Sequence, residues 1–363
     1  MSIEEEIEPI AIDAIREKVF PGCVVGVVYK NGERKVLPFG SFTYEEGATS
    51  VTPDSIYDVA SVTKSIPTAS LALQLIDEGR LKLADKLIDY IPEFRNSDRE
   101  NVLIKHLLTY TIDGYGLASA VDNADGKSLS NRRAEDLIET LMTHDFKKRP
   151  GEVFKYTNIP AALLGLVIEK ITGDTLDNLA QERFFKPLNM AQSTHHPETL
   201  IQENIVPTEF DDWRSDSMSE VRGVVHDESA YICYQDGRAV GHAGLFTTAP
   251  DILNFLEMLL NDGVMDNKRY FSEEILSKME TNQIEELDDF TGLGWELNQK
   301  RYMGDYCTEN TFGKTGFTGT LCICDRKKGV AYVILSNRIY PQRPKDSLAI
   351  NAFRKKIGEI LLK

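Results

Sequence analysis

Two residues that could do chemistry together stand one helical turn apart in the stretch VASVTKSIPTA, residues 59–69. Ser61 and Lys64 lie at the start of a helical pattern, so their side chains share one face. A serine hydroxyl is a weak nucleophile until a base takes its proton, and burial can leave a lysine as a neutral amine able to do so. The start of a helix also stabilises an oxyanion. The spacing therefore favours nucleophilic catalysis, although a surface lysine after a helix-capping serine gives the same pattern.

A tyrosine and an amide form the second candidate group, in the stretch KYTNIP. Tyr156 and Asn158 are separated by one residue in a short loop before a helical pattern, so their side chains could converge on a cleft. A tyrosinate near Lys64 could serve as the base, or a neutral tyrosine could relay the proton. Asn158 could hold Lys64 or a substrate carbonyl. A Tyr-x-Asn turn is also common by chance, so this motif gains its weight from the others.

The stretch FGKTGFTGT carries the third group, Lys314, Thr315, Gly316 and Phe317. It comes just before a β-rich run, which predicts an edge strand. Glycine at position 316 allows a ligand to approach the backbone closely. We expect the backbone N–H of Phe317 to donate to an oxyanion, and Lys314 and Thr315 to bind a substrate carboxylate. The alternative is a glycine-rich hairpin with a solvated lysine.

Strand patterns lie at both ends of the chain and helical patterns lie in the middle. Residues 23–40 read as two strands joined by Asn31-Gly32, a dipeptide that favours a two-residue type I′ turn. The β-rich runs GLGWEL, TLCICDR and VAYVILSN return near the C-terminus. Apolar residues at helical spacing predict helices near both termini, and the middle of the chain is expected to be helical over 100–110, 133–143, 160–171 and 175–185.

The simplest arrangement of these elements is an α/β (α+β) fold. One antiparallel sheet is built from both chain ends and flanked by helices, and a mainly helical domain is inserted. We expect the sheet domain over residues 1–80 plus 235–363 and the inserted domain over 81–234. The active site is expected between the two.

Composition restricts the partners of the protein. The 363 residues are 42% hydrophobic, enough for a sizeable core, and the net charge of −16 argues against nucleic acid. No apolar stretch approaches membrane-spanning length. The N-terminus lacks the features of a signal peptide, which indicates a cytoplasmic protein as the sequence stands and an extracytoplasmic one if a leader was removed. The expected partner is a small-molecule or short peptide substrate, and the oligomeric state stays open.

The sequence gives no sign of a metal or cofactor site. His195-His196 and residues 225–229 contain groups that could bind metal, but adjacent histidines rarely chelate on one face and no matching ligands are spaced for it. A structural role is expected for His242. The cysteines lack zinc spacing and are expected to be core thiols, which favours a reducing compartment; they are Cys23, Cys233, Cys307, Cys322 and Cys324.

Taken in order, Ser-x-x-Lys, Tyr-x-Asn and Lys-Thr-Gly resemble the motifs of the serine penicillin-recognising enzymes. The likeness is closest to class C β-lactamases, to D-alanyl-D-alanine carboxypeptidases of that shape and to related esterases. It extends over about Ser55 to Thr320, through IYDVASVTKS, LIKHLLTYTIDGYG, RPGEVFKYTN, KPLNMAQST, GHAGLFTTAPDILNF and KTGFTGT.

The resemblance implies a serine hydrolase that acts on an ester or amide through an acyl-enzyme. Ser61 is then the acylated nucleophile, and Lys64 and Tyr156 are the proton-transfer pair. The implied substrate-binding residues are Asn158, Lys314, Thr315, Gly316 and Phe317, with the backbone N–H groups of Ser61 and Phe317 as the oxyanion hole. The sheet-plus-helical-domain fold of these enzymes agrees with the arrangement expected from the strand and helix patterns.

The chain also departs from the usual pattern. TYTIDG stands where relatives read Thr-His-Thr-Ser-Gly, so Tyr110, Ile112 and Asp113 change one wall of the cleft. Many relatives that share GFTG carry histidine at the position of Lys314. No Glu-x-x-Leu-Asn segment is present, so we expect the class A deacylation device to be absent.

Two questions stay open at the level of sequence. The first is the substrate, which could be a D-amino-acid peptide, a β-lactam or an ester. The second is whether the protein turns over at all, since a catalytically silent ligand-binding or regulatory protein of the same fold is the alternative. The presence of all the motif residues disfavours that alternative.

Overall fold

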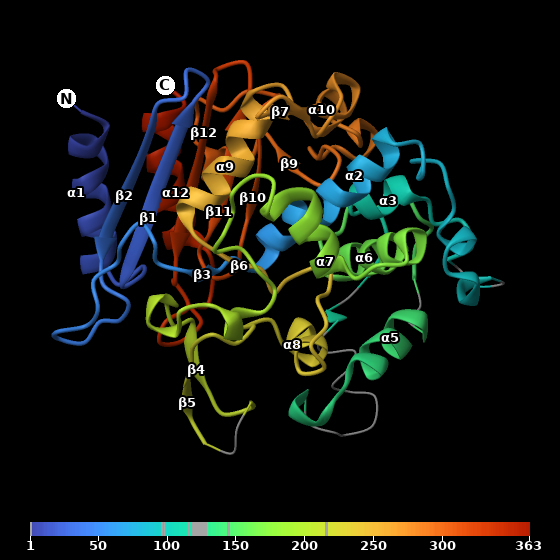
Figure 1. Ribbon diagram of the computed structural model, residues 1–363, viewed down its shortest axis with the longest axis horizontal. Helices are drawn as coiled ribbons and strands as arrows, with labels where there is room; N and C mark the ends of the chain where they lie inside the picture. The colour runs from blue at the N-terminus through green and yellow to red at the C-terminus, as the bar shows by residue number, and fades with distance from the viewer. Residues whose placement is uncertain are drawn as a thin grey trace.

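Figure 1 shows the computed structural model of the chain, which describes residues 2–95, 97, 99–114, 116–117, 129–143, 146–214 and 217–363. Six strands form the central antiparallel sheet, in the order β2 (Arg34–Gly40), β1 (Gly22–Tyr29), β12 (Val330–Ser336), β11 (Leu321–Asp325), β10 (Phe312–Thr315) and β9 (Glu296–Leu297). The two chain ends meet inside the sheet, because β1 pairs with β12 and Cys23 lies opposite Ser336. The predicted sheet, built from both ends of the chain, is confirmed.

Both faces of this sheet are covered, since successive residues of a strand point to opposite sides. In β12, Ile334 packs in the cluster formed by α1 (Ile3–Arg16) and α12 (Leu348–Leu361), whereas Leu335 packs in the cluster that includes α9 (Ala249–Leu260). Figure 1 shows α9 on one side of the sheet and α12 on the other. The sheet is therefore the middle of three layers, and its strands are apolar on both sides.

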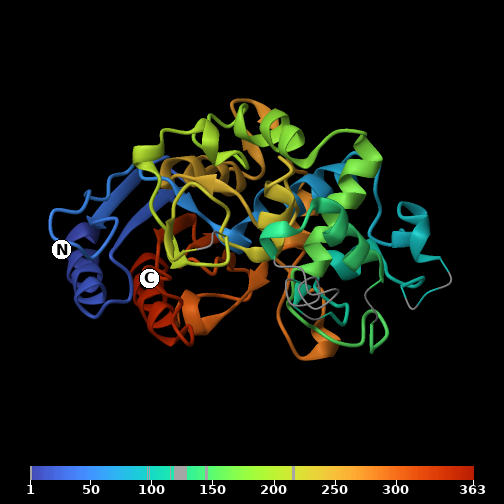
Figure 2. The same cartoon turned by 90° about the horizontal axis from the view of Figure 1, so that it is seen from below.

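The remaining helices lie mostly beside the sheet, and Figure 2 shows this helical part at the opposite end of the molecule from α1 and α12. They are α2 (Ser70–Asp77), α3 (Ile104–Leu108), α5 (Ala134–Thr143), α6 (Ile159–Thr172), α7 (Leu176–Ala180), α8 (Glu228–Tyr234) and α10 (Glu273–Met279), whereas α11 (Lys300–Met303) packs against α12. Short strand pairs complete the fold: β3 (Tyr57–Asp58) with β6 (Phe246–Thr247), β4 (Glu209–Asp211) with β5 (Ser219–Val221), and β7 (Val264–Met265) with β8 (Lys268–Arg269).

Local sequence signals predicted most of these elements but not every turn. The helices expected over 133–143 and 160–171 are α5 and α6, and Gly173 ends α6 with a φ of 74°. The predicted type I′ turn is wrong. Residues 30–33 connect β1 to β2, and among them only Gly32 has a positive φ, whereas a type I′ turn needs two such residues.

Two further expectations concern the core and the membrane. All five cysteines are free and buried, and Cys322 and Cys324 belong to the same hydrophobic cluster, as expected for core thiols. Within the described ranges, no helix combines the length and the apolar character that crossing a bilayer would require.

Candidate active site

The serine and lysine of the first motif lie in a 3₁₀ turn, Ala60–Lys64, directly after β3. Residues i and i+3 eclipse one another in such a turn, because it has three residues per turn. Lys64 Nζ lies 2.8 Å from Ser61 Oγ, which is hydrogen-bond distance. The sequence spacing therefore puts the amine within direct reach of the hydroxyl proton.

The backbone just before Ser61 is held in an unusual conformation. Ala60 has a φ of 49°, in the left-handed region that non-glycine residues rarely adopt. The carboxylate of Asp58 compensates, because its Oδ1 accepts the Ala60 N–H at 2.8 Å. Its Oδ2 accepts the backbone N–H of His226 at 3.0 Å. A buried carboxylate thus fixes the entry into the serine turn.

The loop between β10 and β11 holds the same turn from the sheet side. Thr318 Oγ1 donates to the carbonyl of Asp58 at 2.8 Å, and Thr320 Oγ1 donates to the carbonyl of Val59 at 3.0 Å. This loop also carries Phe317, so the two predicted oxyanion donors belong to segments that are bonded to each other.

Lys64 is only 1% exposed, and its ammonium nitrogen has a second partner in the carbonyl of His242, at 2.8 Å. Burial lowers the pKa of Lys64, and the positive charge of Lys314 lowers it further, whereas Tyr156 and Asp227 partly offset these effects. The net direction is downward, which makes a neutral amine accessible at a lower pH than in water.

Tyr156 lies between two lysines. The centre of its ring is 4.1 Å from Lys314 Nζ and 5.4 Å from Lys64 Nζ. Burial raises the pKa of its hydroxyl, but the two positive charges and a hydrogen bond with Ser61 outweigh it, so the pKa falls. Tyr156 is 42% exposed, and solvent weakens both the burial effect and the lysine charges. The direction therefore rests on the two nearby ammonium groups.

Lys314 is fully buried, and its charge already has a partner. Its Nζ lies 2.9 Å from Glu296 Oε1, and the Tyr302 hydroxyl donates to the other oxygen of Glu296. The ring of Tyr110, a residue with a φ of 55°, lies 4.6 Å from the same ammonium. A substrate carboxylate would have to compete with Glu296, so Lys314 gives no argument for an anionic substrate at this point.

The expectation of an edge strand holds for half of β10. Strand β9 lies outside it but pairs only with Phe312 and Gly313. Lys314 and Thr315 pair with β11 on one side, and among the described residues they have no strand partner on the other. The half of β10 that carries Lys314 and Thr315 is thus the half that pairs with a strand on one side only.

Gly316 fits a space that no side chain could share. A Cβ at this position would lie 2.0 Å from Thr320 Oγ1 and 2.4 Å from the carbonyl oxygen of Val59, two residues before Ser61. Both distances are far inside van der Waals contact. Glycine is therefore required for the close approach of β10 to the serine turn.

We predict that Gly316→Ala lowers the acylation rate by about 100-fold, because it pushes the Phe317 N–H away from Ser61 and small misplacements cost about that much. Stopped-flow acylation by an activated ester measures the rate, and circular dichroism checks the fold. Gly47→Ala is the control for backbone strain alone, since its Cβ meets nothing within 4 Å but its φ of 79° disfavours alanine. A folded Gly316→Ala protein with a normal rate would refute the role of this contact.

The backbone N–H and the ring of Phe317 have different surroundings. In the part of the chain that the structure describes, its N–H donates to no protein acceptor. Its ring stacks on His226, with centres 5.6 Å apart and planes at 15°. The N–H is thus free for a ligand oxygen, and the stacked ring fixes its orientation.

Asn158 is placed differently from the sequence-based expectation. Its Nδ2 donates to Asp227 Oδ2 at 3.1 Å and lies 3.4 Å from Ser229 Oγ. His242 Nε2 is 3.2 Å from Asp227 Oδ1 and 2.8 Å from Ser229 Oγ. The structure therefore links Asn158 to Lys64 indirectly, through Asp227 and His242, whose carbonyl holds the lysine.

Sequence reasoning missed this role of Asp227 and Ser229. Both lie in residues 225–229, where the sequence suggests only possible metal ligands, and the described residues contain no cluster suited to a metal ion. The His242 ring has the expected structural role, and the backbone carbonyl of His242 accepts a hydrogen bond from Lys64 Nζ. The cluster of polar residues at 225–229 was the available signal for a functional role. No local pattern connected this segment with Lys64, which lies more than 150 positions earlier.

Asp227→Asn is expected to lower the free energy of unfolding by about 2 kcal/mol, because charged hydrogen bonds to buried partners are lost. The Asp227 pKa lies well below its ordinary value: burial raises it, but His242, His226 and Ser229 more than compensate. Urea unfolding at neutral pH measures the effect, with the exposed Asp54→Asn as control. A loss under about 0.5 kcal/mol, the range of ordinary surface substitutions, would contradict this account.

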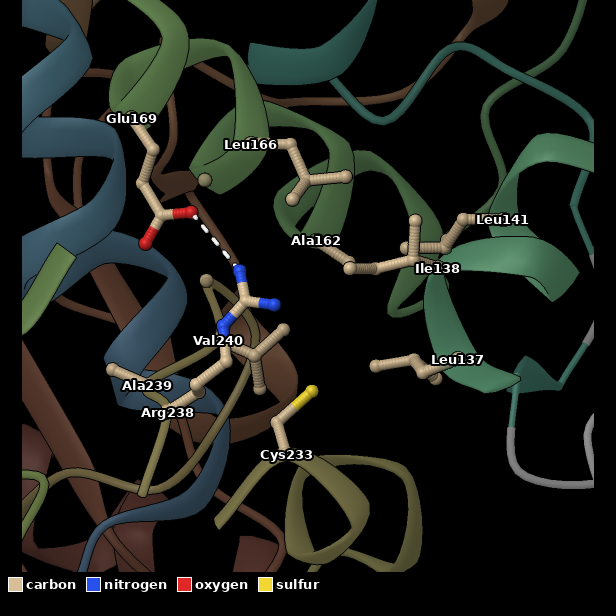
Figure 3. Close-up of a pocket in the computed structure, with 12 residues that line it drawn as sticks. Leu137, Ile138, Leu141, Ala162, Leu166, Glu169, Cys233, Arg238, Ala239 and Val240 are labelled. Carbon is tan, nitrogen blue, oxygen red and sulfur yellow. Dashed lines mark ion pairs between the residues drawn. The ribbon is translucent and has the colours of Figure 1, made fainter. Parts of the chain in front are cut away.

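A separate apolar cavity lies among the helices, away from the polar cluster around Ser61. Figure 3 shows it between α5, α6 and α8, with Glu169 and Arg238 forming an ion pair at 3.6 Å on its edge. The space measures about 20 Å³, enough for about one water molecule. It is too small to hold a substrate.

Comparisons with known proteins agree with the fold. A protein from Escherichia coli K12 named "Putative D-alanyl-D-alanine carboxypeptidase" is 27% identical over 332 residues, which cover 86% of this chain and 76% of that protein. The octameric penicillin-binding protein homologue from Pyrococcus abyssi superposes with a TM-score of 0.74 at 22% identity, over 99% of this chain and 79% of that one. EstCE1, a hydrolase with promiscuous acyltransferase activity, gives a TM-score of 0.78 at 18% identity, over 99% and 98%.

A sequence model of one protein family also spans nearly the whole chain. It matches residues 11–355, which include the serine turn, the Tyr156 loop and the Lys314 strand. The match thus takes in all six strands of the central sheet as well as the polar cluster around Ser61. On this ground the chain belongs to the Beta-lactamase family.

Proposed function

We propose that the protein is a serine hydrolase that cleaves an ester or amide through an acyl-enzyme on Ser61. The observation that carries the proposal is the 2.8 Å contact between Ser61 Oγ and the buried amine of Lys64. Membership of the Beta-lactamase family supports a hydrolase of this kind.

The proposed reaction uses the groups around that contact. Ser61 Oγ attacks the substrate carbonyl carbon while its proton passes to the Lys64–Tyr156 pair, whose pKa values are both lowered. The backbone N–H groups of Ser61 and Phe317 would stabilise the oxyanion. The pair then returns the proton to the leaving alcohol or amine, and water releases the acyl group by the reverse sequence of proton transfers.

The remaining predicted residues are proposed to bind the substrate. Thr315 and Gly316 would line the open half of β10, and Asn158 would face the substrate amide from the start of α6. Lys314 is proposed to act mainly on Tyr156, because its ammonium lies over that ring and is paired with Glu296. We also propose that residues 1–80 plus 235–363 and residues 81–234 form two lobes with the site between them.

Two substrate classes have specific support. D-alanyl peptides are suggested by the name of the Escherichia coli relative, and esters by the description of EstCE1. The charge of Lys314 is neutralised by Glu296, so the carboxylate that ends a D-alanyl peptide gains less here than the sequence suggested. This favours an ester or an uncharged amide as the group bound beside β10.

A substrate panel tests the proposal and its alternative. Short p-nitrophenyl esters, D-alanyl-D-alanine peptides and nitrocefin are each assayed with the wild-type protein and with Ser61→Ala. Turnover of at least one compound, lost in Ser61→Ala, is the expected result. Saturable binding without turnover of any compound would instead establish the catalytically silent binding protein.

A further inference from the structure

A second cavity, of about 510 Å³, lies where α1 ends and α12 begins. Figure 1 shows these two helix ends near the lower edge of the sheet. Lys18 and Tyr44 line the cavity on one side, and the loop from Arg338 to Asp346 lines it on the other. The first turn of α12 completes the wall. None of these residues is used in the proposed hydrolysis.

Two buried polar atoms at this cavity lack partners. Arg338 is 6% exposed, and its guanidinium donates to Ser347 Oγ at 3.0 Å and to the Asp346 carbonyl at 3.1 Å. Its Nε has no hydrogen-bond partner among the described residues, and neither has the hydroxyl of Tyr44. Buried donors are usually satisfied, so each of these two groups still has a hydrogen bond to donate.

The start of α12 supplies further donors. Ser347, the N-cap, makes no side-chain bond to the helix, and the first turn contains no acidic residue. Asp346 Oδ1 accepts the Leu348 N–H at 2.9 Å. In the described part of the chain, the N–H groups of Ala349 and Ile350, which line the cavity, reach no acceptor. The N-terminal end of a 14-residue helix with free N–H groups attracts anions.

The charged side chains around the cavity also favour an anion. Lys18 and Lys345 are exposed and form no ion pair within the described ranges, and with Arg338 they give three positive charges. Two carboxylates also line the cavity. Glu45 accepts from the Tyr340 hydroxyl at 3.4 Å, and the Asp346 carboxylate is bonded to the start of α12. The balance is positive in a chain whose net charge is −16.

We propose that this cavity is an oxyanion-binding site that takes a phosphate or carboxylate group on Arg338, Tyr44 and the start of α12. The site borders the catalytic loop, because the Arg338 guanidinium lies 5.3 Å from the centre of the Phe317 ring and the Arg338 N–H donates to the Thr318 carbonyl at 2.8 Å. The occupant is either a free anion or the anionic end of a substrate that extends past Phe317. The second source rests on the proposed function.

Isothermal titration with inorganic phosphate at constant ionic strength tests the site without any assay of activity. We expect saturable binding with a Kd of about 1 mM or lower. Arg338→Met and Tyr44→Phe should each weaken it, the former by at least about 10-fold because a positive charge and the unpartnered Nε–H are both lost. Lys82→Met, which removes an exposed lysine elsewhere, should leave it unchanged.

Arg338 holds the start of α12 through its hydrogen bonds to Ser347 and Asp346, so Arg338→Met could fold poorly. Lys18→Met combined with Lys345→Met therefore provides a second test, at exposed positions. This double variant should fold normally and bind phosphate at least about 3-fold more weakly. Absence of saturable binding in the wild-type protein would overturn the proposal and leave an adventitious ion only. The same holds if the double variant and Tyr44→Phe both bind phosphate as tightly as the wild type.

Two esters distinguish the sources of the anion. Phosphate that competes with a carboxylate-bearing nitrophenyl ester, and not with nitrophenyl acetate, assigns the site to the substrate's own terminal group. Any other pattern alongside saturable phosphate binding assigns it to a free anion. If neither ester is hydrolysed, the proposed function fails while the titration still decides whether the site exists.

Discussion

Replacing Lys64 with arginine is expected to leave a folded protein that is acylated at least ~100-fold more slowly than the wild type, the usual scale for loss of a general base. Arginine keeps the positive charge, but its guanidinium stays protonated and takes no proton from Ser61. The side chain of Lys64 is buried against Ser61 Oγ and the His242 carbonyl, so its proton transfer is the property that arginine removes. Stopped-flow acylation with an activated ester measures the rate.

Two variants make this result interpretable. Lys64→Met has a similar length and no charge, and it should be equally slow while equalling or exceeding the wild type in stability, because a buried charge is removed. Lys82→Arg makes the same exchange at an exposed site and should change nothing. A folded Lys64→Arg protein with a wild-type acylation rate would show that Lys64 is not part of the base.

Glu296→Gln is expected to move the rising limb of the acylation rate toward lower pH. We assign the limb to loss of a proton from Tyr156, the member of the Lys64–Tyr156 pair whose pKa Glu296 raises and Lys314 lowers. Burial and Glu296 raise the Tyr156 pKa, whereas Lys314 and Lys64 lower it. Removing the negative charge of Glu296 therefore lowers this pKa further. The amide oxygen of glutamine can still accept the hydrogen bond from the Tyr302 hydroxyl, so the local packing is kept.

Adding Lys314→Met to Glu296→Gln is expected to move the same limb the other way. The Lys314 charge lowers the Tyr156 pKa more than Glu296 raises it, so loss of both raises the pKa. Loss of a charge at this distance shifts the limb by about one pH unit or more. At a pH below the limb, this shift lowers the acylation rate about tenfold. The double variant leaves no unpaired buried charge.

The pH dependence of acylation between about pH 5 and 10, measured for all three proteins, checks both signs. Lys268→Met, an exposed lysine on β8, is the control for a general change in net charge. Limbs that stay in place, or that move in the same direction in both variants, would exclude Tyr156 as the group that titrates.

The closeness of Ser61 and Lys64 was predictable because it is local. A spacing of three residues puts two side chains on one face in an α-helix or a 3₁₀ turn, so the prediction did not depend on which of the two forms. The sheet was predictable for a similar reason. Its strands carry continuous apolar runs with turn residues between them, and both faces are covered.

The surroundings of the two lysines were not predictable from local pattern. Glu296 pairs with Lys314 across two strands, and Asp227 acts on Lys64 through His242, so these contacts follow from the tertiary fold. The expectation that Lys314 holds a substrate carboxylate overlooked this partner. The turn after β1 was missed because its register is set by strand pairing, which placed four residues in the loop in place of two.

The most direct test of the account is the site of covalent modification. The folded protein is treated with a fluorophosphonate and, separately, with penicillin, and intact mass is followed by peptide mapping. One adduct per chain, located on Ser61 and greatly slowed in Lys64→Arg, is the predicted result. No adduct with either reagent, or an adduct on a residue other than Ser61, would contradict the proposed acyl-enzyme mechanism.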